Sequence, residues 1–287
     1  MKYGYNGKIL HIDLTTRKFQ VEEPDEAFYR KYMGGSALAM HYLLKDMPAG
    51  VDPLGPENVL VLALSVLTGT AVSGQSRMTA AAKSPLTGAI GDSQGGGFWP
   101  AELKFAGFDA LVIKGKSEGP VYLSINEGKY ELRDAAHLWG KITGEAEASI
   151  KEELGDNKVE VLQIGPAGEK AVRFAGIFSM SNRANGRTGM GAVMGSKNLK
   201  AIAVRGKKRP IAADKAGLSK LAKWGSANLA DSGIAGLAKY GTAETTGANQ
   251  TSGTLPTYNY NSGVFENWEA IDGTTMYDTI LRGAAEG

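Results

Sequence analysis

Two stretches rich in small residues carry the residue types best suited to a phosphate-bearing or flat ligand. They are Ser93–Trp99 (SQGGGFW) and Arg183–Gly191 (RANGRTGMG), here called the first and second glycine loops. Glycine lets a phosphate approach the backbone without a Cβ in the way, and successive N–H groups near a helix start form an anion site. Arg187 lies in the second loop and Arg77 precedes the first, so guanidinium groups are available for phosphate or a ring edge. Tight turns that serve only packing are the alternative interpretation.

No other group of residues forms a convincing catalytic set. The loops match neither a P-loop nor a dinucleotide fingerprint, and no Gly-x-Ser-x-Gly elbow accompanies His137. Asp92 and Asp109 are explained by helix capping or solvated strand ends, and Phe98 and Trp99 are expected in the core. The catalytic residues are therefore unknown at this stage, and no metal-ligating set is predicted.

The composition excludes several classes of protein. The net charge is +2, with 32 basic and 30 acidic residues interspersed, so neither nucleic acid nor a membrane surface is an expected partner. The chain has no cysteine, which removes disulfides, thiolate nucleophiles and the usual anchor of an iron–sulfur cluster. No signal peptide or spanning segment is recognisable, so a soluble, cytoplasmic protein is predicted.

An internal repeat relates the two glycine loops. The segment Ala110–Lys116 (ALVIKGK) returns 91 residues later as Ala201–Lys207 (AIAVRGK), and the same offset aligns Gln94 with Asn185 and Gly95 with Gly186. Each copy has the order hairpin, helix, strand, glycine loop and strand. The fold class predicted is α+β, a duplicated unit of two related mixed β-sheets with short helices, in which both loops face one cleft across a pseudo-two-fold axis.

The elements expected from periodicity and turn residues follow this scheme. Hairpins are predicted at 8–22 and 121–132, buried strands at 59–64, 110–114, 159–164 and 201–204, and helices at 100–105 and 143–154. A helical stretch from Pro24 is expected to break at Gly34, with Ser36 capping a second helix, and 68–92 is expected to be a long polar loop with intermittent strand character. Helical patterns return from Asp214 and at 276–282. The domains predicted are 1–208 and a partial, truncated helical domain at 209–287.

Longer motifs at and around the loops resemble one known family. They are Tyr3–Leu10 (YGYNGKIL), Asp52–Asn58 (DPLGPEN), Lys83–Gly88 (KSPLTG), Glu102–Asp109 (ELKFAGFD) and Gly191–Val204 (GAVMGSKNLKAIAV). From about residue 1 to 207 the sequence is similar to the N-terminal domain of tungsten-containing aldehyde:ferredoxin oxidoreductases, and 214–287 resembles the start of their helical second domain more loosely.

The resemblance implies a saddle of two related sheets that holds a tungsten or molybdenum bis-pterin cofactor, with magnesium bridging the pterin phosphates. The positions that match the family's pterin-binding residues are Arg77, Gln94, Gly96, Arg183, Ala184, Gly186 and Arg187. Departures from the family pattern include Gln94 in place of asparagine, and Asn185 and Thr188 in place of small residues.

The activity implied is oxidation of a small aldehyde to a carboxylic acid, with electrons passing through a [4Fe-4S] cluster to ferredoxin or an electron-transfer subunit. The resemblance leaves a homodimer open and places the cluster cysteines beyond this chain, which has none, so the chain alone is expected to be inactive. Two alternatives remain: a non-catalytic module for cofactor binding or subunit contact, and a generic nucleotide- or phosphate-binding protein.

Overall fold

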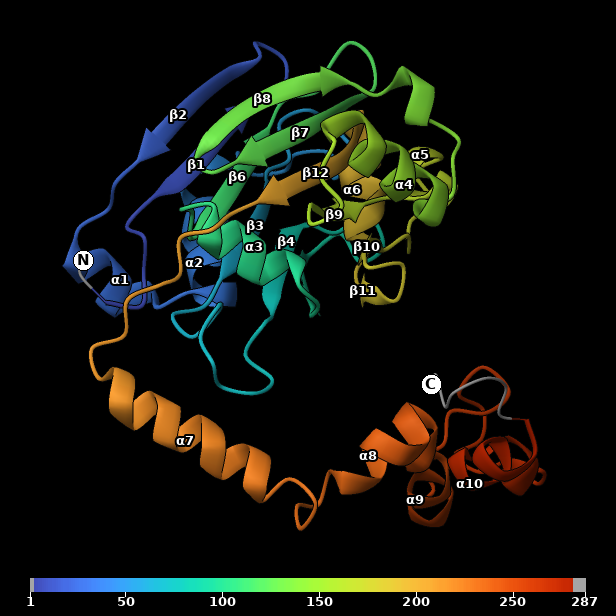
Figure 1. Cartoon of the computed structure of the whole chain (residues 1–287). Coiled ribbons are helices and arrows are strands. Elements are labelled where there is room, and N and C mark those ends of the chain that lie inside the picture. Colours follow the sequence, from blue (N-terminus) through green and yellow to red (C-terminus); the bar gives the residue numbers. More distant parts are fainter. Residues whose placement is uncertain (1–2, 281–287) are drawn as a thin grey trace. The chain divides into compact units, whose positions relative to one another are not determined.

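The computed structural model describes residues 3–280 and divides into two compact units, with the division between Ser219 and Lys220 (Figure 1). The first contains both β-sheets and both glycine loops. The second is built from short helices.

Two six-stranded mixed sheets form the first unit. Sheet A has the order β2-β1-β6-β3-β4-β5, and sheet B has the order β11-β10-β9-β12-β7-β8. In sheet A the strands are β1 (Ile9–Asp13), β2 (Lys18–Glu22), β3 (Leu60–Leu64), β4 (Met78–Lys83), β5 (Ile90–Gly95) and β6 (Ala110–Lys114). In sheet B they are β7 (Val121–Asn126), β8 (Lys129–Asp134), β9 (Glu160–Gln163), β10 (Ile177–Ser179), β11 (Arg183–Asn185) and β12 (Leu199–Arg205). Only β1 with β6 and β7 with β12 pair in parallel, and every other pair is antiparallel.

Helices of the first unit cover the outer faces of the sheets and also pack between them. They are α1 (Glu26–Tyr32), α2 (Gly35–Asp46), α3 (Trp99–Phe105), α4 (Thr143–Leu154), α5 (Pro166–Glu169) and α6 (Met190–Ser196). One buried cluster lies between the two sheets and includes Trp99, Leu103, Met190 and Val193 of α3 and α6. A second joins α1 and α2 to the outer face of sheet A, and a third joins α4 to the outer face of sheet B.

The duplication predicted from the repeat is confirmed by the strand order. Reading β7 to β12 as equivalents of β1 to β6 makes the two sheets identical in topology. At the loops, however, the predicted alignment is wrong by one residue. In sheet A, Ala110 pairs with Ala63, which pairs with Thr79, which pairs with Gln94. In sheet B, the equivalent path runs from Ala201 through Gln163 and Phe178 to Ala184. Gln94 therefore corresponds to Ala184, because the segment that leads from this position to the repeated strand is one residue longer in the second copy (Ala184 to Ala201) than in the first (Gln94 to Ala110).

The same ladders make Gly95 equivalent to Asn185 and Phe19 equivalent to Tyr130. Each equivalent pair is in mutual contact: the rings of Phe19 and Tyr130 lie 4.9 Å apart, and a Cβ on Gly95 would lie 2.4 Å from Oδ1 of Asn185. Contact between equivalent residues is what a two-fold axis requires. The pseudo-two-fold axis thus passes near β2 and β8 at one end and near β5 and β11 at the other.

Several local predictions need correction. Within 68–92, expected to be a long polar loop with intermittent strand character, all of β4 and the first half of β5 form regular antiparallel strands that pair with each other. Helix α2 begins at Gly35 with Gly34 as its cap, so Ser36 lies inside the helix and does not cap it. Trp99 is fully buried as predicted, and its Nε1 donates to the carbonyl of Ile202 at 2.9 Å. Phe98 is 61% exposed, so its prediction as a core residue is wrong.

Asp109 is the centre of a buried polar cluster, which corrects its prediction as a capping or solvated residue. Its carboxylate lies 2.6 Å from Nζ of Lys104, and both side chains are almost fully buried. It also accepts hydrogen bonds from the backbone N–H groups of Asn6 and Gly7 and from the hydroxyl of Tyr29. Burial lowers the pKa of Lys104, while the attraction of Asp109 opposes that shift. The motifs Tyr3–Leu10 and Glu102–Asp109 therefore serve to anchor the N-terminal segment.

A second buried lysine joins the two copies. Nζ of Lys197, after α6 in the second copy, donates to the carbonyl oxygens of Pro56, Asn58 and Gly115 in the first. Burial lowers the pKa of Lys197 to about 8. The copies are thus held together by polar contacts as well as by their shared core.

The second unit contains the end of α7 (Lys215–Ala227), then α8 (Ala235–Tyr240), α9 (Thr245–Ser252) and α10 (Gly273–Thr275). Among residues 220–279 only Thr257 and Gly273 are buried. The helix predicted at 276–282 is helical from Met276 to Ile280, and its last two positions lie outside the described residues. Within residues 3–280, every helix is too short or too polar to cross a membrane.

Candidate functional site

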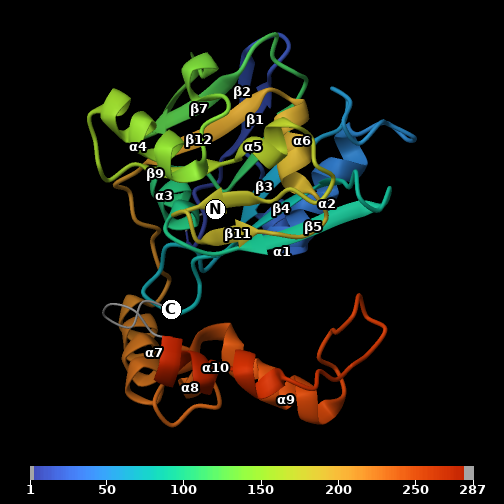
Figure 2. The same ribbon diagram turned by 90° about the vertical axis from the view of Figure 1, so that its right-hand side faces the viewer.

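The two glycine loops meet where β5 of sheet A lies beside β11 of sheet B (Figure 2). Nδ2 of Asn185 donates to the carbonyl of Ser93 at 2.6 Å, and the backbone N–H of Arg187 donates to Oγ of Ser93 at 3.1 Å. Oγ of Ser179 donates more weakly to the carbonyl of Gly96 at 3.4 Å. Segments about ninety residues apart in sequence therefore form one surface.

The end of the first loop is fixed on both sides. Oγ of Ser76 donates to the carbonyl of Gly97 at 2.6 Å, and the backbone N–H of Phe98 points to Sδ of Met180 at 3.3 Å. Gly97 has a φ of 98°, in the region that favours glycine, and a Cβ there would lie about 3 Å from Met180 and Arg183. The bare backbone at Gly97 is thus required by the approach of the second loop.

Three arginines surround this junction. Arg77 immediately precedes β4, whose Met78 pairs with Gly95; Arg183 begins β11; and Arg187 follows it. All three side chains are exposed, and within residues 3–280 none of them is in an ion pair. Unpaired guanidinium groups beside open backbone form a site for an anion, because an anion would satisfy donors that the protein leaves to solvent.

The other sequence-predicted site residues lie on the same two strands or directly after them. Gln94 is in β5 and Ala184 is in β11. These two positions of the glycine loops are therefore in strands. Both are exposed, as is Gly186, and Gly96 is half-buried. The fold thus brings all seven predicted positions to one edge of the sandwich of sheets.

The start of α2 lies near the outer face of this edge. A Cβ on Gly35 would lie 3.4 Å from Oγ1 of Thr79, which pairs with Gln94 in the ladder. No side chain caps the first turn of α2, so its N–H groups and the positive end of the helix dipole remain available to an anion. Sequence reasoning missed this feature because the two glycines indicated only a helix break.

Ser93, Asn185 and Thr188 were also missed as site-building residues. Ser93 and Asn185 are nearly fully buried. Thr188 has a φ of 61°, which is strained for a β-branched residue, and its carbonyl accepts a hydrogen bond from Oγ of Ser84 at 2.7 Å. The only sequence signal was that Asn185 and Thr188 are larger than the residues usual at these positions.

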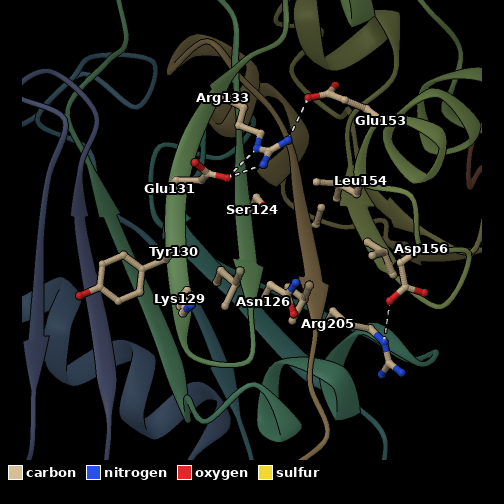
Figure 3. Close-up of a pocket in the computed structure, with 14 residues that line it drawn as sticks. Ser124, Asn126, Lys129, Tyr130, Glu131, Arg133, Glu153, Leu154, Asp156 and Arg205 are labelled. Carbon is tan, nitrogen blue, oxygen red and sulfur yellow. Dashed lines mark hydrogen bonds and ion pairs between the residues drawn. The ribbon is translucent and has the colours of Figure 1, made fainter.

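A separate cavity of about 400 Å³ lies on the outer face of sheet B and provides a contrast (Figure 3). Its arginines are paired: Arg133 contacts Glu131 and Glu153 at 2.6 and 3.3 Å, and Arg205 contacts Asp156 at 3.1 Å. Both arginines of this cavity therefore already face carboxylates, in contrast to the arginines of the loop junction. The difference singles out the loop junction as the candidate site.

The described residues of the junction include no cluster of side chains arranged to hold a metal ion. Across residues 3–280, no group of three or more His, Asp or Glu side chains is arranged to hold a metal ion. The arrangement can therefore bind and orient an anionic group, while chemistry would have to come from the bound group or from elsewhere in the protein.

Comparisons of the sequence with a protein family and with curated proteins point to the same family. The family described as "Aldehyde ferredoxin oxidoreductase, N-terminal domain" matches residues 9–206. A tungsten-containing aldehyde ferredoxin oxidoreductase of Thermococcus kodakarensis is 46% identical over 276 residues, which cover 96% of this chain and 46% of that protein. The WOR-like subunit of an aliphatic sulfonate oxidoreductase of Pyrococcus furiosus is 37% identical over 219 residues, covering 71% of this chain and 35% of that protein.

A solved structure shares the fold. The active-site complex BamBC of benzoyl coenzyme A reductase, determined with 1,5-dienoyl-CoA, aligns with a TM-score of 0.72 and 40% sequence identity. The alignment covers 74% of this chain and 32% of that chain. The chain thus spans less than half the length of the proteins that it matches.

Proposed function

The chain belongs to the aldehyde ferredoxin oxidoreductase family, whose N-terminal domain it contains, and from this we propose that it is the cofactor-binding part of an enzyme that oxidises aldehydes to carboxylic acids. The observation that carries the proposal is the junction of β5 and β11, where three exposed arginines with no ion pair among the described residues lie beside bare glycine backbone. A pterin cofactor carries phosphates and a flat ring edge rich in acceptors, so its chemistry fits this donor set.

The roles of individual residues follow from their positions. Arg77, Arg183 and Arg187 would neutralise and orient the cofactor phosphates or pair with the pterin edge. Gly96 and Gly186 would leave backbone N–H groups accessible at close range, and Gln94 and Ala184 would line the surface between them. When bound, a tungsten or molybdenum bis-pterin group would supply the two-electron redox chemistry, and a magnesium ion would accompany its phosphates. We propose residues 1–208 as the pterin-binding domain and 209–287 as part of a helical second domain.

The remaining parts of the reaction belong to the complete protein. Because this chain has no cysteine, we propose that the [4Fe-4S] cluster, the acid–base residues and the closure of the aldehyde pocket lie outside it. Ferredoxin or an electron-transfer subunit would accept the electrons. A homodimer and a cytoplasmic location stay predictions.

The absence of cysteine also favours a second candidate, a non-catalytic module for cofactor binding or subunit contact. The two candidates differ in what accompanies this chain. A Cys-x2-Cys-x3-Cys segment in the complete protein supports the enzyme, and a complete protein without one supports the module.

The test is to replace Arg183 or Arg187 with alanine in the complete protein and to measure pterin and tungsten or molybdenum per protein. Loss of one charge-assisted contact costs about 1.5–3 kcal/mol, so each variant should bind pterin roughly 10- to 100-fold more weakly. The thermal midpoint should not change, because neither side chain is buried. Arg30→Ala, which removes an exposed arginine from α1, is the matched control. Wild-type levels of pterin and metal in both loop variants would refute the assignment.

A further inference from the structure

We propose that Ser93 and Asn185 are positioning residues that join the two glycine loops into one preformed unit, fixing the backbone of Arg187 before any ligand binds. The proposal rests on the proposed function only in taking these loops as the cofactor site. Neither residue is among the positions inferred to contact the cofactor.

The contacts run across the boundary between the two copies. Asn185 is 1% exposed and Ser93 is 2% exposed. The side chain of Asn185 donates to the backbone carbonyl of Ser93 at 2.6 Å, and the side chain of Ser93 accepts from the backbone N–H of Arg187 at 3.1 Å. Each residue thus uses its side chain to hold the backbone of the opposite copy. Because both are shielded from water, neither contact is readily replaced by solvent.

Pseudo-symmetry explains why one copy carries the side chain and the other does not. Gly95 and Asn185 are equivalent positions, and Oδ1 of Asn185 occupies the space that a Cβ on Gly95 would enter at 2.4 Å. Two side chains at equivalent positions beside the axis would collide. The asymmetric pair Gly95 and Asn185 therefore lets β5 and β11 approach closely enough for Ser93 to reach the second loop.

The consequence for the site concerns Arg187 in particular. Its side chain has no ion-pair partner within residues 3–280. The position of its guanidinium group therefore depends on how its backbone is held. The backbone is held on one side by Ser93 and on the other by Thr188, whose carbonyl accepts from Ser84. Loss of the hydroxyl of Ser93 should free the loop between Asn185 and Thr188 and leave the arginine itself intact.

The test compares Ser93→Ala, Asn185→Ala and Gly95→Ala with the unsubstituted complete protein. Gly95→Ala adds a methyl group that must displace the side chain of Asn185, so it should reproduce the effect of Asn185→Ala without altering any hydrogen-bonding group. Ser93→Thr keeps the hydroxyl and should rescue. Ser124→Ala is the matched control, because Ser124 is a nearly buried strand serine of β7 with no side-chain hydrogen bond among the described residues.

The readout is amide hydrogen exchange at Arg187, measured without added ligand, together with pterin content after purification. We expect exchange at Arg187 to rise about tenfold in Ser93→Ala and to stay at the wild-type rate in Ser93→Thr and Ser124→Ala. Pterin content should fall severalfold in Ser93→Ala, while far-UV circular dichroism should show the same folded secondary structure as in the control.

Unchanged exchange at Arg187 in Ser93→Ala would overturn the proposal, and so would faster exchange with full pterin content. If Asn185→Ala does not fold, Ser93→Ala decides the matter, since it removes a single hydroxyl. Absence of pterin from the unsubstituted protein would instead refute the proposed function, while the exchange rates would still show whether the loops are joined.

Discussion

Replacing Asp109 with alanine should destabilise the first unit severely, because it leaves Lys104 charged and buried. The Lys104 side chain is 0% exposed, and its Nζ has Asp109 as its partner at 2.6 Å. Removing one member of a buried pair typically costs about 3–5 kcal/mol, since the remaining charge is no longer compensated. The backbone N–H groups of Asn6 and Gly7 lose their acceptor in the same variant.

The loss should depend on pH in a definite direction. Burial lowers the pKa of Lys104 in the folded protein, and Asp109 is the group that opposes this shift. Without Asp109, the pKa of Lys104 falls further below its unfolded value. Between those two pKa values the unfolded state binds more protons than the folded state, so stability rises as the pH rises. The deficit of Asp109→Ala should therefore be smaller at pH 9 than at pH 7.

The free energy of unfolding is measured by guanidinium chloride titration, followed by far-UV circular dichroism and by tryptophan fluorescence. Coincident transitions by the two probes show that unfolding is two-state, so that the free energies can be compared. Asp92→Ala is the control, because Asp92 is half-buried and forms no ion pair within the described residues, so it should change stability by only about 0.5 kcal/mol. The double variant Lys104→Met, Asp109→Ala should recover part of the loss. A loss below about 1 kcal/mol for Asp109→Ala, or a double variant no more stable than the single one, would refute the reasoning.

Two further predictions concern single side chains. Glu22 is partly buried, which raises its pKa, yet hydrogen bonds from His11 and Tyr42 and the charge of Lys45 lower the pKa overall. The contribution of ionised Glu22 to folding stability is thus fully present above its pKa in the unfolded chain and is lost as the pH falls through its pKa in the folded protein. Glu22→Gln should therefore flatten the acid side of the curve of stability against pH. An unchanged curve would contradict this. Phe98→Ala should change unfolding free energy by less than about 1 kcal/mol and Trp99→Ala should cost about 3–5 kcal/mol, whereas similar denaturation midpoints for the two variants would contradict the assigned burial.

Local sequence pattern determined much of this protein. Alternating and continuous apolar runs predicted the hairpins, the buried strands at 59–64 and 110–114 and their counterparts, because side-chain period depends only on neighbouring residues. The 91-residue repeat predicted a duplicated α+β unit, and identical strand orders confirm it. Motif similarity identified the family, which the comparisons establish for residues 9–206.

Only the tertiary structure decided which residues meet. Phe98 and Trp99 are adjacent in sequence, yet Phe98 faces solvent and Trp99 faces the core. Phe98 is the cap residue before α3, whereas Trp99 is the first residue of the helix. Asp109 looked like a strand-end carboxylate until its partners Lys104, Gly7 and Tyr29 were placed around it. The contacts with Gly7 and Tyr29 join distant segments, and no local pattern encodes them.

The glycine loops show the division most clearly. Their composition alone offered two interpretations, a phosphate or cofactor site with nearby arginines or tight turns that serve only packing, since small residues suit both. The pairing of Gly95 with Asn185, and the use of Ser93 to hold Arg187, appeared only when the ladders of both sheets were followed to the pseudo-two-fold axis. An axis is a property of two packed copies, so neither copy's sequence can reveal which of its residues lie beside it.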